Sequence, residues 1–211
     1  MKLVVATRNP DKLSEIRALL DLPGTEFLSA MDFPNLSEVE EDGDTLEANA
    51  IKKAVTLSGC VRLWAIADDT GLEVEALNGA PGVYSARFSG ADATYDDNNA
   101  KLLSSLKGHR NRKARFRTVV ALSDPIGQSQ WVQGECPGVV VEEMRGCNGF
   151  GYDPLFQPDG QSLTFSEMDT RTKNTLSHRA RAFARALEAW AFLFSGQSAT
   201  WPGPSKSGDG D

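Results

Sequence analysis

The stretch Trp64-Ala65-Ile66-Ala67-Asp68-Asp69-Thr70-Gly71-Leu72-Glu73-Val74 decides the fold. Its apolar beginning, residues 63–67, is typical of a buried strand, and we expect this strand to end at Asp68 and Asp69. Two adjacent carboxylates there need compensation from a cation, a helix N-terminus or a metal ion. Because ligands in open α/β sheets bind just beyond the carboxyl ends of strands, the pair is a candidate metal or general-base site. The alternative is a solvated turn, which Asp-Asp-Thr-Gly favours.

Length and composition narrow the class of protein. With 211 residues, 40% of them hydrophobic, the chain can form one sizeable domain or two small lobes. A net charge of −7 argues against a nucleic-acid partner. Three cysteines without metal-ligand spacing fit a reducing compartment. Apolar runs are too short for a membrane span or a signal peptide, so we expect a soluble cytoplasmic protein with no membrane partner. Residues 196–211 predict a disordered tail after a domain spanning residues 1–195.

The N-terminal segment predicts a strand, a loop and a helix. Residues 3–6 are apolar, and the loop after them carries Thr7, Asn9 and Lys12. Asn9 is suited to cap a helix whose first position is Pro10. Hydroxyl groups, backbone amides and positive charge at a strand–helix junction are the components of a phosphate site. The spacing is not that of a P-loop, so an ordinary capped helix remains the alternative.

The next segment predicts a short strand and a second helix. Residues 26–29 form the strand, and the acidic run that follows it is most often just a solvated surface. Asp44, with Glu47 three residues later, is typical of a helix start. Asn49 and Lys53 are four residues apart and therefore share one face of this helix. A lysine there is more often exposed than bound to a ligand.

The middle of the chain predicts a hairpin. Residues 72–77 alternate apolar and polar side chains, which favours a half-exposed strand. Residues 115–122 and 128–135 flank a turn and predict two antiparallel strands, with a further strand at 139–143. An antiparallel region attached to an otherwise α/β chain indicates a mixed sheet.

Two later segments carry groups suited to a nucleotide. The glycine-rich residues 146–156 contain Phe150 and Tyr152, which either stack on a base or fill the core at a glycine-rich corner. Positive charge gathers around the start of the last helix through Lys173, His178 and Arg179. Such charge is slightly unfavourable for the helix itself, which weakens the interpretation that it is merely exposed.

These groups complement one another. Carboxylates hold Mg²⁺, which prefers oxygen ligands and keeps waters for phosphate substrates. Basic side chains can neutralise the remaining phosphate charge, and aromatic rings can hold a base. Together they meet the requirements of nucleoside triphosphate chemistry.

The sequence closely resembles the inosine triphosphate pyrophosphatase family, whose members are Ham1-like. The match runs from Lys2 to about Trp190 and contains several separated motifs in the family's order. The motifs lie at residues 6–15, 40–50, 67–72, 79–88, 149–154 and 177–179. This resemblance implies an α/β fold with a long, mixed, twisted sheet flanked by helices, and two lobes with a central substrate cleft. It also implies a homodimer. The implied reaction is Mg²⁺-dependent hydrolysis of the small-molecule substrates ITP, dITP or XTP to the monophosphate and pyrophosphate.

The resemblance also implies roles for individual residues. Asp69 matches the catalytic proton acceptor, and Asp69 and Glu41 match the metal-binding acids, although Glu40 is an alternative to Glu41 and Asp68 can share the role of Asp69. Arg8 stands where the family commonly has glycine. The implied substrate-binding residues are Thr7, Asn9, Lys12, Lys53, Thr70, Phe150, Gly151, Tyr152, Asp153, Lys173, His178 and Arg179.

Two other functions remain open. A Maf-like nucleotide pyrophosphatase shares the architecture but prefers modified pyrimidine or methylated nucleotides. A nucleotide-binding protein without catalytic activity is the second alternative, and turnover with Mg²⁺ separates it from the enzymes.

Overall fold

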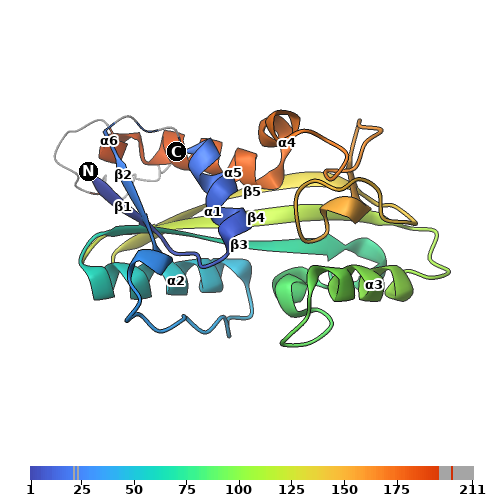
Figure 1. Cartoon of the computed structure of the whole chain (residues 1–211), viewed down its shortest axis with the longest axis horizontal. Coiled ribbons are helices and arrows are strands. Elements are labelled where there is room, and N and C mark those ends of the chain that lie inside the picture. Colours follow the sequence, from blue (N-terminus) through green and yellow to red (C-terminus); the bar gives the residue numbers. More distant parts are fainter. Residues whose placement is uncertain (21, 23, 195–200, 202–211) are drawn as a thin grey trace, which may run out of the picture.

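A computed structural model describes residues 1–20, 22, 24–194 and 201 (Figure 1). Long strands run the length of the molecule between two layers of helices (Figure 1). The strands are β1 Lys2–Val5, β2 Glu26–Ser29, β3 Trp64–Val74, β4 Lys113–Ser123, β5 Ser129–Val140 and β6 Phe156–Pro158. The α-helices are α1 Pro10–Leu19, α2 Leu46–Val61, α3 Tyr95–Ser105, α4 Thr170–Leu176, α5 His178–Ala189 and α6 Ala191–Phe194. Short 3₁₀ helices lie at Ala30–Asp32, Glu75–Leu77, Gly82–Arg87 and Asp153–Leu155.

The strands form one mixed sheet in the order β2-β1-β3-β4-β5-β6. β1 pairs in parallel with β2 and β3, whereas β3, β4, β5 and β6 pair with their neighbours in antiparallel fashion. The predicted mixed sheet and its hairpin are therefore confirmed. Because β1 ends at Val5, its pairing with β3 is limited to residues 64–66 of that strand. Among the described residues, no strand continues that pairing beyond Ile66, so the middle of β3 presents an open edge.

The prediction that β3 ends at Asp68 is wrong. β3 continues through Asp68 and Asp69 to Val74 and pairs with β4 along residues 65–74. Both carboxylates therefore lie in the middle of a strand, and their side chains are buried at 2% and 5% exposure. The solvated-turn alternative is also wrong. Basic side chains from three helices, Lys12, Lys53 and Arg179, contact the pair and offset the cost of burying it.

Other predicted boundaries shift for local reasons. The half-exposed strand at 72–77 ends at Val74, where a 3₁₀ helix begins. Residues 139–143 are not a separate strand, because β5 runs unbroken to Val140. Helix α2 is capped by Thr45, whose hydroxyl accepts from the amide of Ala48, rather than by Asp44. The predicted start of α1 is confirmed, with Asn9 as its cap and Pro10 at its first position.

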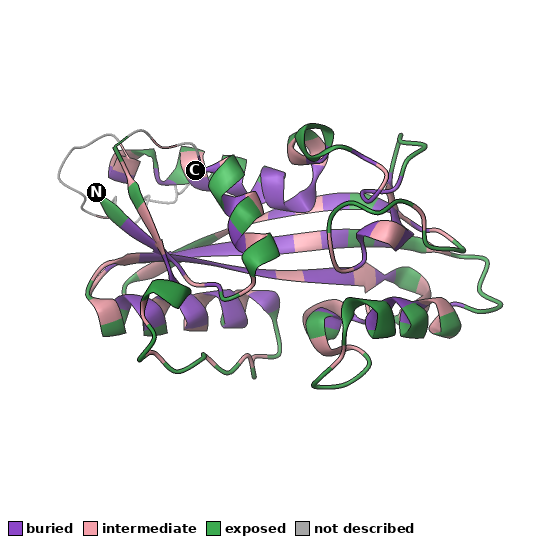
Figure 2. Ribbon diagram, viewed as in Figure 1, coloured by how far each residue is buried: buried purple, intermediate pink, exposed green. Residues whose placement is uncertain are grey.

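Helices cover both faces of the sheet. α2 and α3 lie on one face, and α1, α4, α5 and α6 lie on the other (Figure 1). Buried residues follow the strands and the helix faces turned toward them (Figure 2). One hydrophobic cluster includes Leu3, Ile66 and Trp190, and a second, at the other end of the sheet, includes Leu72 and Phe156. The central part of β3, with its two carboxylates, lies between these clusters.

The predicted tail, residues 196–211, lies outside the described residues except for Trp201. The Trp201 ring lies 5.4 Å from the Trp64 ring, measured between centroids. No helix in the described part of the chain is both long and apolar enough to cross a membrane.

Candidate active site

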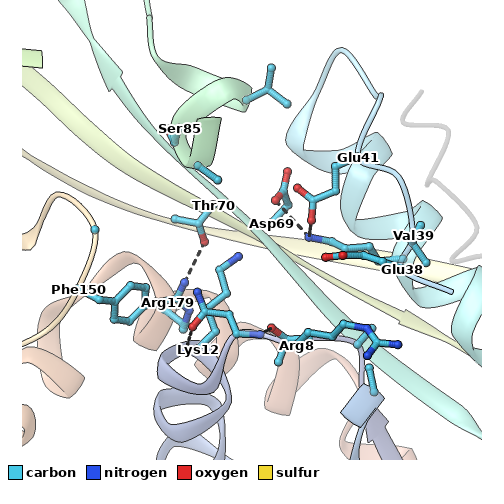
Figure 3. A pocket seen from close by; sticks show the side chains of 18 of the residues that line it. Arg8, Lys12, Glu38, Val39, Glu41, Asp69, Thr70, Ser85, Phe150 and Arg179 are labelled. Atoms are coloured by element: carbon cyan, nitrogen blue, oxygen red, sulfur yellow. Dashed lines mark hydrogen bonds and ion pairs between the residues drawn. The ribbon is translucent and has the colours of Figure 1, made fainter. Parts of the chain in front are cut away.

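A cavity of about 560 Å³ opens at the exposed edge of β3. Its walls come from the β1–α1 loop, the loop before α2, helix α2, strand β3, the 150–153 loop and the starts of α4 and α5 (Figure 3). The structure brings every predicted site residue to this cavity: Thr7, Asn9, Lys12, Glu41, Lys53, Asp69, Thr70, Phe150, Gly151, Tyr152, Asp153, Lys173, His178 and Arg179. The two residues held as alternatives, Glu40 and Asp68, do not line it.

Asp69 faces α2. Lys53 Nζ lies 2.8 Å from Glu41 Oε1 and 3.2 Å from Asp69 Oδ1, so one ammonium group bridges the two acids. Asn49 Nδ2 donates to Asp69 Oδ2 at 3.3 Å. Lys53 is 7% exposed, so the expectation of a surface lysine is wrong. Figure 3 shows Glu41 and Asp69 pointing toward the same position.

The two acids differ in proton affinity. Burial raises the pKa of Asp69 and outweighs the opposing charges of Lys53 and Lys12. Burial also acts on Glu41, but there the Lys53 charge and hydrogen bond prevail and lower the pKa. Lys53 itself is desolvated, yet Asp69 and Glu41 raise its pKa, so it stays charged. Asp69 is therefore the better proton acceptor of the two carboxylates.

Asp68 faces the opposite side of the sheet, because successive side chains of a strand alternate. Arg179 Nη2 and Nε donate to Asp68 Oδ2 at 3.2 and 3.3 Å, and Lys12 Nζ lies 3.7 Å away. Burial disfavours the charged form, but Lys12 and Arg179 outweigh it and hold the pKa of Asp68 below its usual range. Asp68 thus holds the Arg179 and Lys12 side chains in the cavity wall, a different role from that of Asp69.

The loop before α2 is held at three points. Arg87 Nη2 donates to the Glu41 carbonyl at 2.8 Å, and Arg8 Nη2 donates to the Leu36 carbonyl at 2.5 Å. The Gly43 amide donates to Asn49 Oδ1 at 2.8 Å. Asn49 therefore links this loop to Asp69, a role that sequence reasoning missed although it placed Asn49 and Lys53 on one helix face.

The β1–α1 loop forms an ordinary helix cap and also contributes side chains to the cavity. Asn9 Oδ1 accepts from the amides of Asp11 and Lys12, which makes an ordinary capped helix. The Thr7, Asn9 and Lys12 side chains nevertheless line the cavity. Asn9 Nδ2 also donates to Tyr95 Oη at 2.9 Å, and no local signal near Tyr95 predicts this contact.

The two aromatic residues of the 150–153 loop have different surroundings. Tyr152 is 5% exposed, and its hydroxyl donates to the Ser85 carbonyl at 2.9 Å. Phe150 is half-buried, lies 5.9 Å from the Tyr95 ring and faces the cavity. Tyr152 therefore fills the core, and Phe150 remains available for stacking.

A basic cluster surrounds Phe150. Lys173 Nζ lies 5.1 Å and Arg179 Cζ 5.6 Å from its ring centroid. Lys173 Nζ also donates to Glu15 Oε1 and Asp153 Oδ2, each at 2.6 Å. Sequence reasoning also missed Glu15. Its position in α1 gives no sign that α4 and α5 supply its partners.

His178 is buried beside this cluster. Its ring stacks on Phe116 with centroids 4.3 Å apart, and its Nδ1 is buried without a hydrogen-bond partner in the described structure. Burial, followed by the charges of Arg179 and Lys173, lowers the pKa of His178 well below its usual value. The ring is therefore neutral in the folded chain.

We expect His178 to make the protein less stable in acid. The folded chain keeps this imidazole neutral, whereas the unfolded chain binds a proton below about pH 6.5. Each pH unit below that point lowers the free energy of unfolding by at most ~1.4 kcal/mol. Urea unfolding at about pH 7.5 and pH 5 is therefore expected to show a smaller acid loss in His178→Gln than in the unmodified chain. Equal losses in the two proteins would contradict this assignment.

The donor set suits a magnesium ion. Mg²⁺ binds through one or two carboxylates and fills its other positions with water and substrate phosphates. Glu41 and Asp69 offer two carboxylates to one position, and Lys53 already shows that this position favours a cation. In the described part of the chain, no group of three or more His, Cys, Asp or Glu residues is arranged for a metal. A site of two acids is compatible with that finding.

Comparison with known proteins gives consistent matches over nearly the whole chain. A model of the Ham1 family matches residues 3–189. A dITP/XTP pyrophosphatase of Desulforamulus reducens is 49% identical over 190 residues, which cover 89% of this chain and 94% of the relative. Another, of Geobacter sulfurreducens, is 52% identical over 186 residues, which cover 87% and 93%. The solved structure of the Staphylococcus aureus Ham1 protein superposes with a TM-score of 0.81 at 34% identity, covering 92% of this chain and 98% of that one.

Proposed function

The chain belongs to the Ham1 family, and on this premise we propose that it hydrolyses deaminated purine nucleoside triphosphates (ITP, dITP and XTP) to the nucleoside monophosphate and pyrophosphate. Relatives named dITP/XTP pyrophosphatases, about half identical to this chain, support the substrate class. The observation that carries the proposal is the placement of Asp69. This carboxylate has a raised pKa and lies in the cavity beside the Lys53 ammonium group. The same cavity also contains the Phe150 ring with Lys173 next to it.

In this proposal Asp69 accepts a proton from the attacking water. The water oxygen bonds to the α-phosphorus, the bond from that phosphorus to the bridging oxygen breaks, and pyrophosphate leaves. Lys12 and Lys53 neutralise phosphate charge from opposite sides of β3. Glu41 and Asp69 would hold Mg²⁺, which supplies further charge neutralisation when bound.

Selection of the base rests on buried donors. Lys173 and Arg179 lie beside Phe150, on which the purine would stack, and His178 lines the same cavity. A 6-oxo group accepts hydrogen bonds from such donors, whereas a 6-amino group leaves a donor facing a donor. A buried mismatch of this kind costs about 1–3 kcal/mol per unmet group, which gives strong discrimination.

We further propose a homodimer that acts in the cytoplasm. The three cysteines, Cys60, Cys136 and Cys147, are free thiols, as in proteins of a reducing compartment. Light scattering coupled to gel filtration tests the dimer directly, since a monomer and a dimer differ twofold in mass.

The test of the proposed reaction is pyrophosphate release with Mg²⁺ from ITP, dITP, XTP, ATP, GTP and a modified pyrimidine triphosphate. We expect strong release from the three deaminated purine nucleotides and little from ATP and GTP. Release confined to the pyrimidine would replace the proposal with a Maf-like activity. Binding without release from any nucleotide would leave a nucleotide-binding protein without catalytic activity.

Substituting Glu41 tests the metal site. We expect Glu41→Gln to raise the Mg²⁺ concentration for half-maximal activity by about 10- to 100-fold, because it removes one of two carboxylate ligands. Glu40→Gln is the matched control, since Glu40 is exposed and does not line the cavity. A Mg²⁺ titration of the rate measures both. A shift in the Glu40 variant alone would exchange the two assignments.

A further inference from the structure

The cavity continues past the reaction centre into a segment that hydrolysis of a triphosphate does not require. Beyond Glu41 and Lys53 it is walled by the residues that follow β2 and by the second half of α2. We call this segment the far arm. It is lined by Ala30, Leu36, Val39, Thr56, Leu57 and Cys60.

The strand register fixes the direction of the far arm. Phe116 of β4 pairs with Leu72 of β3, and its ring stacks on His178. His178 and the basic cluster beside it therefore lie toward the C-terminal end of β3. Helix α2 leads into β3 through a short turn, so Cys60 near its end lies toward the beginning of β3. Cys60 is two turns beyond Lys53, about 10 Å along the helix axis. Figure 3 shows the same order, with Phe150 and Val39 at opposite ends and Asp69 between them.

A bound nucleotide must therefore point its leaving group toward the far arm. With its base on Phe150 and its α-phosphate at Asp69, the β- and γ-phosphates extend away from Phe150. Arg8 marks the point where the phosphates would end, since this residue lines the cavity and its Nη2 donates to the Leu36 carbonyl.

The lining of the far arm does not suit additional phosphate. Leu36 packs against the hydrophobic cluster that contains Leu57, and Ala30 and Val39 add further apolar surface. Glu38, on the same wall, repels anions. Apolar walls with a few polar groups are typical of a site for an organic ligand.

Building on the proposed function, we propose that the far arm receives an organic group esterified to the γ-phosphate, such as a second nucleoside. The substrate class is then a dinucleoside polyphosphate in which at least one base is a deaminated purine. For diinosine triphosphate, water attacks the phosphorus next to the first inosine, and the bond from that phosphorus to the central phosphate breaks. The products are IMP and IDP, and no other reactant is needed.

The proposal is tested by comparing the rates at which the protein hydrolyses diinosine triphosphate and ITP. We expect kcat/KM for the two to agree within about tenfold, with IMP and IDP as products by chromatography. Cys60→Trp, which fills the far arm, is expected to lower the diinosine triphosphate rate by at least about tenfold and to leave ITP within about twofold. Gly59→Trp is the matched control, because a Cβ at Gly59 meets nothing within 4 Å and Gly59 does not line the cavity. Cleavage of ITP without cleavage of diinosine triphosphate would overturn the proposal and leave the proposed function intact.

Labelling of Cys60 with a maleimide separates occupancy of the far arm from turnover. In an Asp69→Asn chain, diinosine triphosphate is expected to slow labelling of Cys60 at least about fivefold, and ITP to slow it little. Cys147, exposed and outside the cavity, is the internal reference. Protection of Cys60 together with absent ITP turnover in the unmodified chain would overturn the proposed function and support the far arm. Equal labelling with and without diinosine triphosphate would overturn the far arm.

Discussion

Asp69→Asn is expected to reduce kcat for ITP by about 10²- to 10⁴-fold while nucleotide binding is retained. The amide keeps the shape of the side chain and its hydrogen bond with Asn49, but it cannot accept the proton of the attacking water. Burial raises the pKa of Asp69, whereas the Lys53 charge lowers that of Glu41, so Asp69 is the better proton acceptor of these two carboxylates. Steady-state pyrophosphate release gives kcat, and calorimetric titration of ITP gives the affinity.

The control for this variant is Asp42→Asn. Asp42 is an exposed carboxylate in the loop that also carries Glu41, and it pairs with Lys52 at 2.6 Å. We expect its kcat to stay within about twofold of the unmodified chain, because screened surface pairs contribute little. Activity of Asp69→Asn near that of Asp42→Asn would remove Asp69 from the proposed mechanism.

Arg179→Gln is expected to lower the free energy of unfolding by about 3–5 kcal/mol. Arg179 is 2% exposed and joins Asp68 of β3 to Glu15 of α1. Removing its charge leaves these two poorly exposed carboxylates without their common partner. Burial opposes the charge of Arg179, yet Asp68 and Glu15 raise its pKa, so the folded chain depends on the charged form. Urea unfolding followed by circular dichroism measures the change.

Arg185→Gln is the matched control, since it makes the same substitution in the same helix. Arg185 is exposed and donates to the Gln133 carbonyl at 2.8 Å. A loss below about 1 kcal/mol is expected there. A similarly small loss in Arg179→Gln would show that Asp68 and Glu15 find adequate compensation elsewhere, mainly from Lys12 and Lys173.

Local patterns in the sequence predict the elements that local physics controls. Asn9 and Pro10 place the start of α1, because a cap and a fixed φ act within one turn. The hairpin of β4 and β5 follows from two strand-like runs that flank a turn. The family resemblance then brought together residues that no local pattern connects, and the structure places all of them at one cavity.

The continuation of β3 could not be predicted in the same way. Asp68 and Asp69 resemble a turn unless their cationic partners are known, and those partners lie far away in the sequence. Arg179 follows Asp68 by 111 residues. Alternation then sends the two acids to opposite faces, so neighbours in sequence acquire different tasks. Tyr95 and Glu15 were missed for the same reason, because only tertiary packing brings them to Phe150 and Lys173.

The three-point attachment of the loop before α2 has a thermodynamic consequence. Irregular backbone loses about 1–2 kcal/mol of conformational entropy per residue when it is fixed. Arg8, Arg87 and Asn49 fix this loop through hydrogen bonds within the chain itself. The ordering of Glu41 therefore belongs to the free energy of folding, and the arriving nucleotide meets a preorganised wall. Its contacts contribute to affinity without first having to order the loop.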